Sequence, residues 1–130
     1  GDRIMRVCEL MVGDLVLHDG KVIQADAVHK RKIGYHKTKD KLTWLFSGQF
    51  KPILLTPEIL EKNGFKKDFE LQGCYWRPDC RKYCIVKEIE TWYFAFRHMG
   101  GGHICIFECN YVHELQHALK LCKIEKKIEI

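Results

Sequence analysis

Asp19 and Gly20 separate two short runs rich in leucine, valine and isoleucine, and this arrangement constrains the fold more than any other feature of the chain. Both residue types tolerate the positive φ angles that a two-residue turn between antiparallel strands requires. The flanking runs combine partial alternation with β-branched residues, which is typical of strands. Residues 13–28 are therefore predicted to form a β-hairpin.

A short helix is predicted after residue 55. Thr56 suits the N-cap, Pro57 suits the first helical position, and Glu58 places a negative charge near the positive end of the helix. Asn63 and Gly64 are expected to end the helix, since both residue types adopt the left-handed conformation found there. A helix of about two turns needs packing to hold it in place.

The stretch 69–108 is predicted to be antiparallel sheet, because it is rich in aromatic and β-branched residues. Strands are expected at 83–89, 91–97 and 103–108. Residues 73–81 contain Pro78 and are predicted to form a loop.

A second helix is predicted from Asn110, as its cap, to about Lys123, and the alternating tail 126–130 suits a short edge strand. The expected fold class is α+β. An N-terminal SH3-like small β-barrel or curled sheet (1–55) is followed by a half (56–130) with a helix, an antiparallel β-meander and a C-terminal amphipathic helix. A chain of 130 residues supports one hydrophobic core, so a single domain is expected.

The cysteines and the apolar runs bear on the compartment. The chain has seven cysteines, an odd number, and most lie in apolar stretches, where a free cysteine behaves as a small hydrophobe. Reduced thiols are typical of the cytoplasm, which is the expected location. No apolar run approaches the roughly 20 residues that cross a bilayer, so no membrane partner is expected.

The run 113–117 matches the H-E-x-x-H pattern of zinc hydrolases. Because residues four apart share a helix face, His113 and His117 can bind one zinc ion while Glu114 activates a water molecule. A minimal zinc-dependent hydrolase of the metallopeptidase type is therefore one hypothesis, with zinc as its cofactor.

A third zinc ligand, which a catalytic site needs, is hard to find for this motif. The extended form of the pattern requires glycine and histidine where this chain has Lys120 and Lys123. The remaining candidates are Glu125 and Glu129 downstream, and His98, His103 and Cys109 upstream. The leading expectation is therefore a protein without a metal cofactor.

The helix that contains the motif also has an apolar stripe. At about 100° per residue, one face collects the side chains of Tyr111, Val112, Leu115, Ala118, Leu119 and Cys122. His113 and His117 fall on the opposite side with Lys120, and both histidines are predicted to face water. An amphipathic helix without a catalytic role is the expected interpretation.

Cysteine spacing gives a weaker metal hypothesis. Cys80 and Cys84 have a spacing seen in structural zinc sites, but a matching second pair is missing. Cys105 and Cys109 would lie about 13 Å apart on a continuous strand, too far to share an ion. The cysteines are predicted to be packed or half-exposed free thiols.

The segment 30–41 is strongly basic and precedes a tryptophan. A phosphate backbone and a stacked base can be contacted by Lys30, Arg31, Lys32, Lys37, Lys39 and Trp44. The segment is predicted to be a basic loop or a wide solvated hairpin, and a solvated loop whose charge aids solubility explains it equally well. The leading hypothesis is a non-catalytic binding or accessory module whose partner is nucleic acid or another protein. An oligomerising role for the aromatic residues 92–96 is a third alternative.

Three groups of residues together resemble a known family. They are Val-Gly-Asp-Leu-Val at 12–16 with 19–22, Pro-Ile-Leu-Leu-Thr-Pro-Glu-Ile-Leu at 52–60 with 63–65, and Tyr-Val-His-Glu-Leu-Gln at 111–116. The set is similar to small uncharacterised proteins of Bacteroides-type gut bacteria and their mobile elements, over nearly the whole chain. The resemblance implies no known activity, substrate or cofactor. It implies that the positions of Glu114 and His117 usually carry amides, and the cysteine-rich stretch 74–84 departs from the family pattern.

Overall fold

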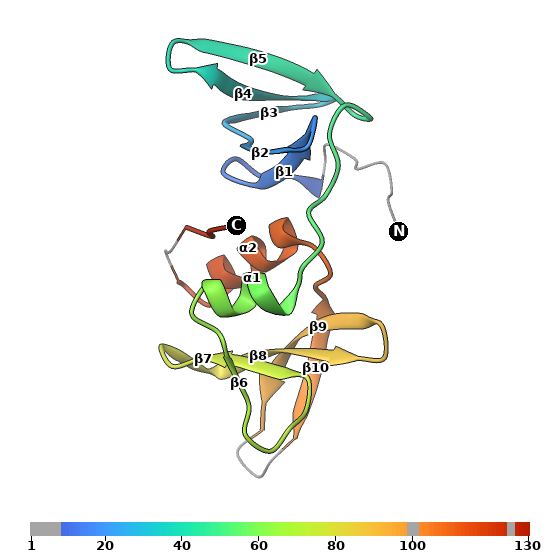
Figure 1. Cartoon of the computed structure of the whole chain (residues 1–130), viewed down its shortest axis with the longest axis vertical. Coiled ribbons are helices and arrows are strands. Elements are labelled where there is room, and N and C mark those ends of the chain that lie inside the picture. The colour runs from blue at the N-terminus through green and yellow to red at the C-terminus, as the bar shows by residue number, and fades with distance from the viewer. Residues whose placement is uncertain (1–8, 99–101, 125–126) are drawn as a thin grey trace. The chain divides into compact units, whose positions relative to one another are not determined.

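The computed structural model describes residues 9–98, 102–124 and 127–130 and consists of antiparallel strands with two short helices. Its residues group into two compact units, 1–53 and 54–130 (Figure 1). The boundary after residue 53 lies close to the one predicted after residue 55. The α+β class is confirmed, and a single domain made of both units stays a prediction.

The first unit begins with the predicted hairpin. Strands β1 (Leu15–His18) and β2 (Lys21–Gln24) pair antiparallel through a turn at Asp19 and Gly20, whose φ angles are 50° and 74°. Positive φ at both central residues gives the turn type whose twist matches that of the strands. The hairpin prediction is confirmed.

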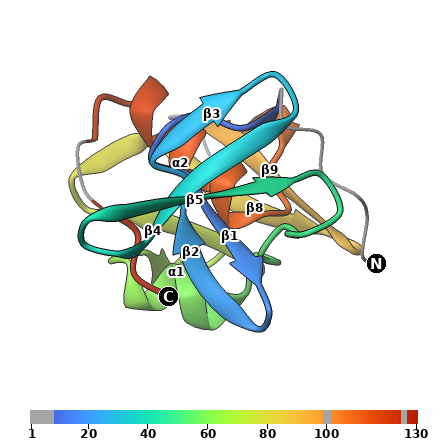
Figure 2. The same ribbon diagram turned by 90° about the horizontal axis from the view of Figure 1, so that it is seen from above.

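The basic segment that follows is largely strand. A three-stranded antiparallel sheet is formed by β3 (Ala27–His29), β4 (Lys32–Thr38) and β5 (Lys41–Phe46), with β4 in the middle (Figure 2). The connections are two-residue turns, at 30–31 and 39–40. The segment is neither the predicted basic loop nor a wide solvated hairpin, because its turns are tight and Ile33, Tyr35 and Leu45 give β4 and β5 a buried apolar side.

One core stabilises the first unit. Its buried residues are Leu10, Val16, Ala25, Ile33, Tyr35, Leu45 and Phe50. Backbone hydrogen bonds of 2.9 Å in both directions between Leu17 and Lys51 attach the end of the unit to β1. The described strands of this unit form open sheets, and none of these sheets closes into a barrel.

The second unit begins with α1 (Pro57–Lys62), which starts and ends as predicted. The Thr56 hydroxyl accepts a hydrogen bond of 3.2 Å from the Ile59 backbone N–H, so it caps the helix. Gly64, with a φ of 88°, follows the last turn in the left-handed region. These local signals are sufficient to place a helix of only six residues.

A five-stranded antiparallel sheet forms the other layer of this unit, in the order β10-β9-β8-β7-β6. Its strands are β6 (Lys66–Lys67), β7 (Cys74–Arg77), β8 (Cys80–Glu88), β9 (Thr91–Arg97) and β10 (His103–Glu108). The prediction of a loop at 73–81 is wrong, because Pro78 and Asp79 form a tight turn between two strands. Arg77 is 4% exposed and donates two hydrogen bonds of 2.8 Å to the Asp79 carboxylate, which holds this turn.

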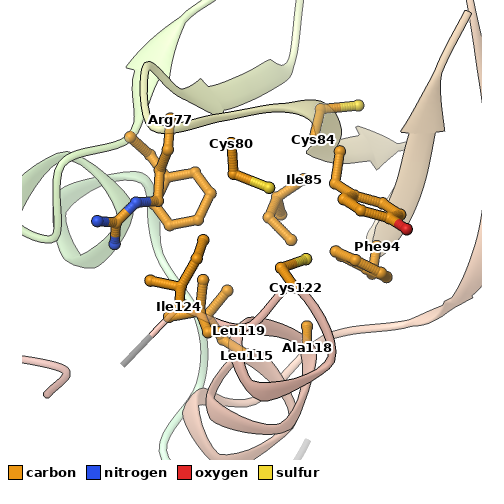
Figure 3. A pocket seen from close by; sticks show the side chains of 12 residues that line it. Arg77, Cys80, Cys84, Ile85, Phe94, Leu115, Ala118, Leu119, Cys122 and Ile124 are labelled. Atoms are coloured by element: carbon orange, nitrogen blue, oxygen red, sulfur yellow. The ribbon is translucent and has the colours of Figure 1, made fainter. Parts of the chain in front are cut away.

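The second helix, α2 (Val112–Leu121), packs on this sheet, and Figure 1 shows both helices on the same side of it. Side chains from α2 and the sheet line a small apolar pocket of about 10 Å³, which is room for roughly one water molecule (Figure 3). Tyr111 is the N-cap rather than the predicted Asn110, because the Asn110 side chain accepts a hydrogen bond of 2.9 Å from the Trp92 N–H. No helix in the described part of the chain is long and apolar enough to cross a membrane.

The last described residues, 127–130, do not form the predicted edge strand. They bond instead to the end of α1. The Asn63 amide donates to the Glu129 carbonyl and accepts from the Glu129 N–H, both at 2.7 Å. Ile128, the residue before Glu129, is buried. The tail is therefore held by the packing of Ile128 and by the hydrogen bonds of Asn63.

Candidate nucleic-acid interface

The outer face of the three-stranded sheet carries aromatic and basic side chains together. Opposite residues of paired strands share a face. The register pairs Lys32 with Phe46, Gly34 with Trp44, and His36 with Leu42. The residues between them, such as Ile33 and Leu45, belong to the core on the other side. We term the residues on the outer side the aromatic-basic face and define it as Lys32, His36, Leu42, Trp44 and Phe46, of which Lys32 and Leu42 are partly buried.

Two rings of the aromatic-basic face are open to solvent. Trp44 is 39% exposed and Phe46 is 55% exposed. Residues two apart on a strand lie about 6.6 Å apart on one face, so neighbouring bases of an extended strand can each meet one ring. Gly34 lies opposite Trp44, and a Cβ at this position would be 3.0 Å from Leu42 Cδ2. Glycine therefore lets Leu42 pack against the sheet beside the tryptophan.

Lys32 places its ammonium over the Trp44 ring, 4.5 Å from the ring centroid. At an exposed site such a cation–π contact contributes about 0.5–1 kcal/mol. A base stacked on an aromatic side chain contributes about 1–3 kcal/mol. A base stacked on Trp44 would therefore gain more than is lost by displacing Lys32.

The predicted basic residues lie at the two ends of β4 rather than in one loop. Lys30 and Arg31 form the turn before the strand, whereas Lys37 and Lys39 lie at its other end. The extended chain between these ends spans roughly 26 Å. Residues 29–41 contain six lysines and arginines and one aspartate, a net charge of +5, which equals the net charge of the whole chain. The positive excess of the protein therefore lies around this one sheet.

Asp26 holds the imidazole of His36 at the edge of the aromatic-basic face. Asp26 Oδ2 is 2.8 Å from His36 Nδ1, and Gln24 Nε2 donates to Oδ1 at 2.8 Å. The hydrogen bond from the His36 side chain is the main cause that lowers the pKa of the Asp26 carboxyl. Because the folded pKa is lowered, this contact stabilises the fold above the ordinary aspartate pKa, and its contribution is lost as the pH falls through the lowered value.

Sequence reasoning found Lys32 and Trp44 in this site but missed three of its members. Phe46, Leu42 and His36 are brought onto the same face by the pairing of β4 with β5. The alternation of apolar residues at 42, 44 and 46 was the available signal, since it predicts one apolar face of a strand. Which residues of β4 lie beside residues 42, 44 and 46 depends on the register of the two strands, and the turn between the strands sets this register.

The H-E-x-x-H run occupies the first turns of α2, and the predicted exposure of its histidines is wrong for His113. His113 is 1% exposed, and His117 is partly buried. The His113 ring stacks on Tyr111 and meets the His117 ring edge-on, with centroids 5.8 Å apart in both pairs. The apolar period locates the centre of the buried stripe, but this first turn is buried over a wider arc that includes Val112, His113 and Leu115.

Glu114 has a structural role at the start of the same helix. Its Oε1 accepts hydrogen bonds from the backbone N–H groups of Asn110 at 3.0 Å and Tyr111 at 3.2 Å. A carboxylate in this place satisfies donors that the helix cannot bond itself and interacts favourably with the helix dipole. One oxygen of the Glu114 carboxylate is therefore engaged in capping.

We expect Glu114→Ala to lower the free energy of unfolding by about 1 kcal/mol, because two backbone donors lose their acceptor. Glu114→Gln keeps a side-chain oxygen and should cost less. Lys120→Ala, on the exposed side of α2, is the matched control and should change stability little. Urea unfolding followed by circular dichroism compares the three variants, and a Glu114→Ala protein as stable as the wild type would contradict the capping role.

The described residues do not complete a three-ligand site around His113 and His117. Among them, one group of histidine, cysteine or carboxylate donors lies within 4.8 Å of one another, and neither histidine belongs to it. The candidates His98, His103, Cys109 and Glu129 are therefore not grouped with the motif, and Glu125 lies outside the described residues.

The thiols are arranged differently from their spacing in the sequence. Cys80 and Cys122 both point into the apolar pocket and are hydrogen-bonded to each other (Figure 3), whereas the Cys84 thiol is hydrogen-bonded to the Cys74 thiol. Burial is the main cause that raises the pKa of Cys122 to about 12. The six cysteines in the described part of the chain are free, and only Cys105 among them is exposed. Cys80 and Cys84 thus have separate thiol partners.

The aromatic hairpin proposed for oligomerisation is mostly interior. Trp92 and Phe94 are each 5% exposed, and Phe96 is 39% exposed. Exposed aromatic rings and basic side chains coincide on the aromatic-basic face, where Trp44 and Phe46 are 39% and 55% exposed. Comparison with protein-family models, with curated proteins and with solved structures found no match to this chain.

Proposed function

We propose that this protein is a non-catalytic module that binds single-stranded nucleic acid on its aromatic-basic face. One observation carries the proposal: two exposed rings lie on a sheet whose central strand has a positive cluster at each end. Rings stack bases with little regard to sequence, and lysine and arginine contact phosphates. The same division of labour is used by sheet-based RNA-binding domains.

The proposed binding proceeds in a simple physical order. The two positive clusters attract the phosphate backbone at long range and place it along β4. Lys32 then leaves the Trp44 ring for a phosphate, and bases stack on Trp44 and Phe46. Affinity is expected to depend strongly on salt, because each phosphate contact releases condensed counterions.

We also propose an SH3-like curled sheet for the first unit. Its two-stranded ribbon and three-stranded sheet enclose one core, as such a fold would. Small, partly open β-barrels commonly present a sheet face to nucleic acid. A cytoplasmic accessory protein encoded by a mobile element would encounter this partner, which agrees with the family resemblance.

The proposal is tested with fluorescently labelled oligonucleotides of thymidine or uridine and anisotropy measurements over a series of salt concentrations. Wild-type protein should bind, and the logarithm of its affinity should fall linearly with the logarithm of salt, with a slope of roughly 0.7 per phosphate contact. Reversal of Lys30, Arg31 and Lys32 to glutamate should reduce both the affinity and this slope.

The matched control reverses Lys66, Lys67 and Lys82, three exposed lysines of the second unit, and changes the net charge by the same amount. It should retain most of the binding. Equal loss in the two triple variants would mean that only net charge matters. Unchanged binding by the first variant, or equal affinity for a duplex, would contradict the proposed site.

A further inference from the structure

Three metal-ligating side chains of the second unit lie together on β8 and β10. His103 Nε2 is 2.8 Å from Glu88 Oε1, and Cys105 Sγ is 3.8 Å from the same oxygen. One donor atom from each residue lies within 4.8 Å of the other two. We refer to these residues as the three-donor cluster. It is independent of the aromatic-basic face, which belongs to the first unit.

The strands explain how the donors meet. His103 and Cys105 are two residues apart on β10, so their side chains share one face of the strand. Cys105 pairs with Ala95 of β9, and Ala95 pairs with Cys84 of β8. Glu88 lies at the end of β8, where it pairs with Thr91, and its carboxylate reaches both donors of β10.

We propose that Glu88, His103 and Cys105 bind one divalent metal ion of the zinc class. Thiolate, imidazole and carboxylate are the ligand types of zinc, and tetrahedral bonds of roughly 2.0–2.3 Å place donor atoms roughly 3.3–3.7 Å apart. The two separations from Glu88 Oε1, 2.8 Å to His103 Nε2 and 3.8 Å to Cys105 Sγ, lie just below and just above that range. Side-chain rotation is therefore sufficient to form the site, and three protein ligands leave the fourth position for water.

The same residues do not form a nucleophilic triad. In a triad the carboxylate orients the imidazole from the side remote from the nucleophile. Here Glu88 contacts the Cys105 thiol itself, with Oε1 3.8 Å from Sγ. A negative neighbour disfavours the thiolate, whereas a bound cation favours it. The arrangement thus suits metal binding better than nucleophilic attack.

The cluster is accessible to an ion from solvent. The His103 side chain is 17% exposed and the Glu88 side chain is 50% exposed. The second ring nitrogen of His103, Nδ1, is shielded from solvent and makes no hydrogen bond among the described residues. The Nε2 atom, which contacts Glu88, is the ring nitrogen that would bind the ion.

The test uses tag-free protein kept reduced and stripped of metal, titrated with zinc in a calorimeter and with cobalt in a spectrophotometer. Wild-type protein should bind one equivalent of either ion, and cobalt should give a thiolate-to-metal charge-transfer band. Cys105→Ser should abolish this band. Cys105→Ser and His103→Ala should each weaken zinc binding by more than the roughly 10- to 100-fold that loss of an outer-shell partner costs.

Two matched variants locate the ion. Cys122→Ser removes another thiol, and His117→Ala removes a member of the H-E-x-x-H pair, and both should leave zinc affinity unchanged. Equal unfolding midpoints in urea without metal show that the cluster variants remain folded, as their partial exposure predicts. Zinc binding that survives Cys105→Ser and His103→Ala, or that His117→Ala abolishes, would overturn the proposal.

Discussion

Leu115→Ala should lower the free energy of unfolding by about 2–5 kcal/mol, the usual cost of removing a buried leucine side chain. Leu115 is 0% exposed and lines the apolar pocket together with Ile85 and Phe94 of the sheet. The substitution removes apolar burial and leaves a cavity in a layer that has room for little more than one water molecule. A loss of this size is a large share of the stability of a small domain.

The same helix offers a matched control. Leu121→Ala makes the identical change at a side chain that is 69% exposed, and it should alter stability by less than about 0.5 kcal/mol. Leu115→Met, which conserves volume, should cost less than about 1.5 kcal/mol and keeps the comparison possible if the alanine variant does not fold.

Urea unfolding followed by far-ultraviolet circular dichroism measures these differences. Both described helices belong to the second unit, so the helical signal reports on the unit that contains Leu115. A Leu121→Ala variant as destabilised as Leu115→Ala would show that α2 does not pack through its predicted apolar stripe.

Features that depend on neighbouring residues were predictable from the sequence. The Thr56 cap, the stop after α1 and the Asp19-Gly20 turn each follow from the conformations that one or two residue types allow. The stripe of α2 follows from the helical period, and Leu115 is buried as it predicts. In these places local preference and tertiary packing agree.

Features that depend on contacts between distant residues were not predictable. Proline in the stretch 73–81 predicts a loop, yet Pro78 lies in a tight turn between two strands, a place that suits its fixed φ. The burial of His113 depends on the residues that surround the first turn of α2, and the helical period of the sequence does not identify these residues. The three-donor cluster joins Glu88 to residues on another strand, and only the fold brings them together.

Part of the candidate nucleic-acid site, namely its residue types, was predictable from the sequence, and its arrangement in space was not. Composition identified the basic residues and Trp44, because charge and aromatic character are visible without a fold. The sequence did not show that Lys30 and Lys39 lie at opposite ends of a strand, nor that Phe46 is opposite Lys32. Because the segment is a sheet and not a loop, its basic residues lie along one line, which suits an extended nucleic-acid strand.

Trp44→Ala should weaken oligonucleotide binding by about 5- to 150-fold, which corresponds to the loss of about 1–3 kcal/mol from one stacked base. The change removes no charge, so the slope of affinity against salt should stay the same at the lower affinity. Reversal of Lys30, Arg31 and Lys32 changes that slope, so the two experiments separate stacking from phosphate contact. Trp44→Phe retains an aromatic face and should recover most of the binding.

Phe69→Ala is the control for loss of an exposed ring, since Phe69 is fully exposed in the second unit, and it should bind as the wild type does. Anisotropy of the labelled oligonucleotide measures affinity, and quenching of tryptophan fluorescence on binding should disappear with Trp44. Trp92 is buried and Trp76 is covered by Arg97, 5.0 Å from its ring centroid, so neither should contribute that signal. Full affinity in Trp44→Ala, or a changed salt slope, would show that bases do not stack on this face.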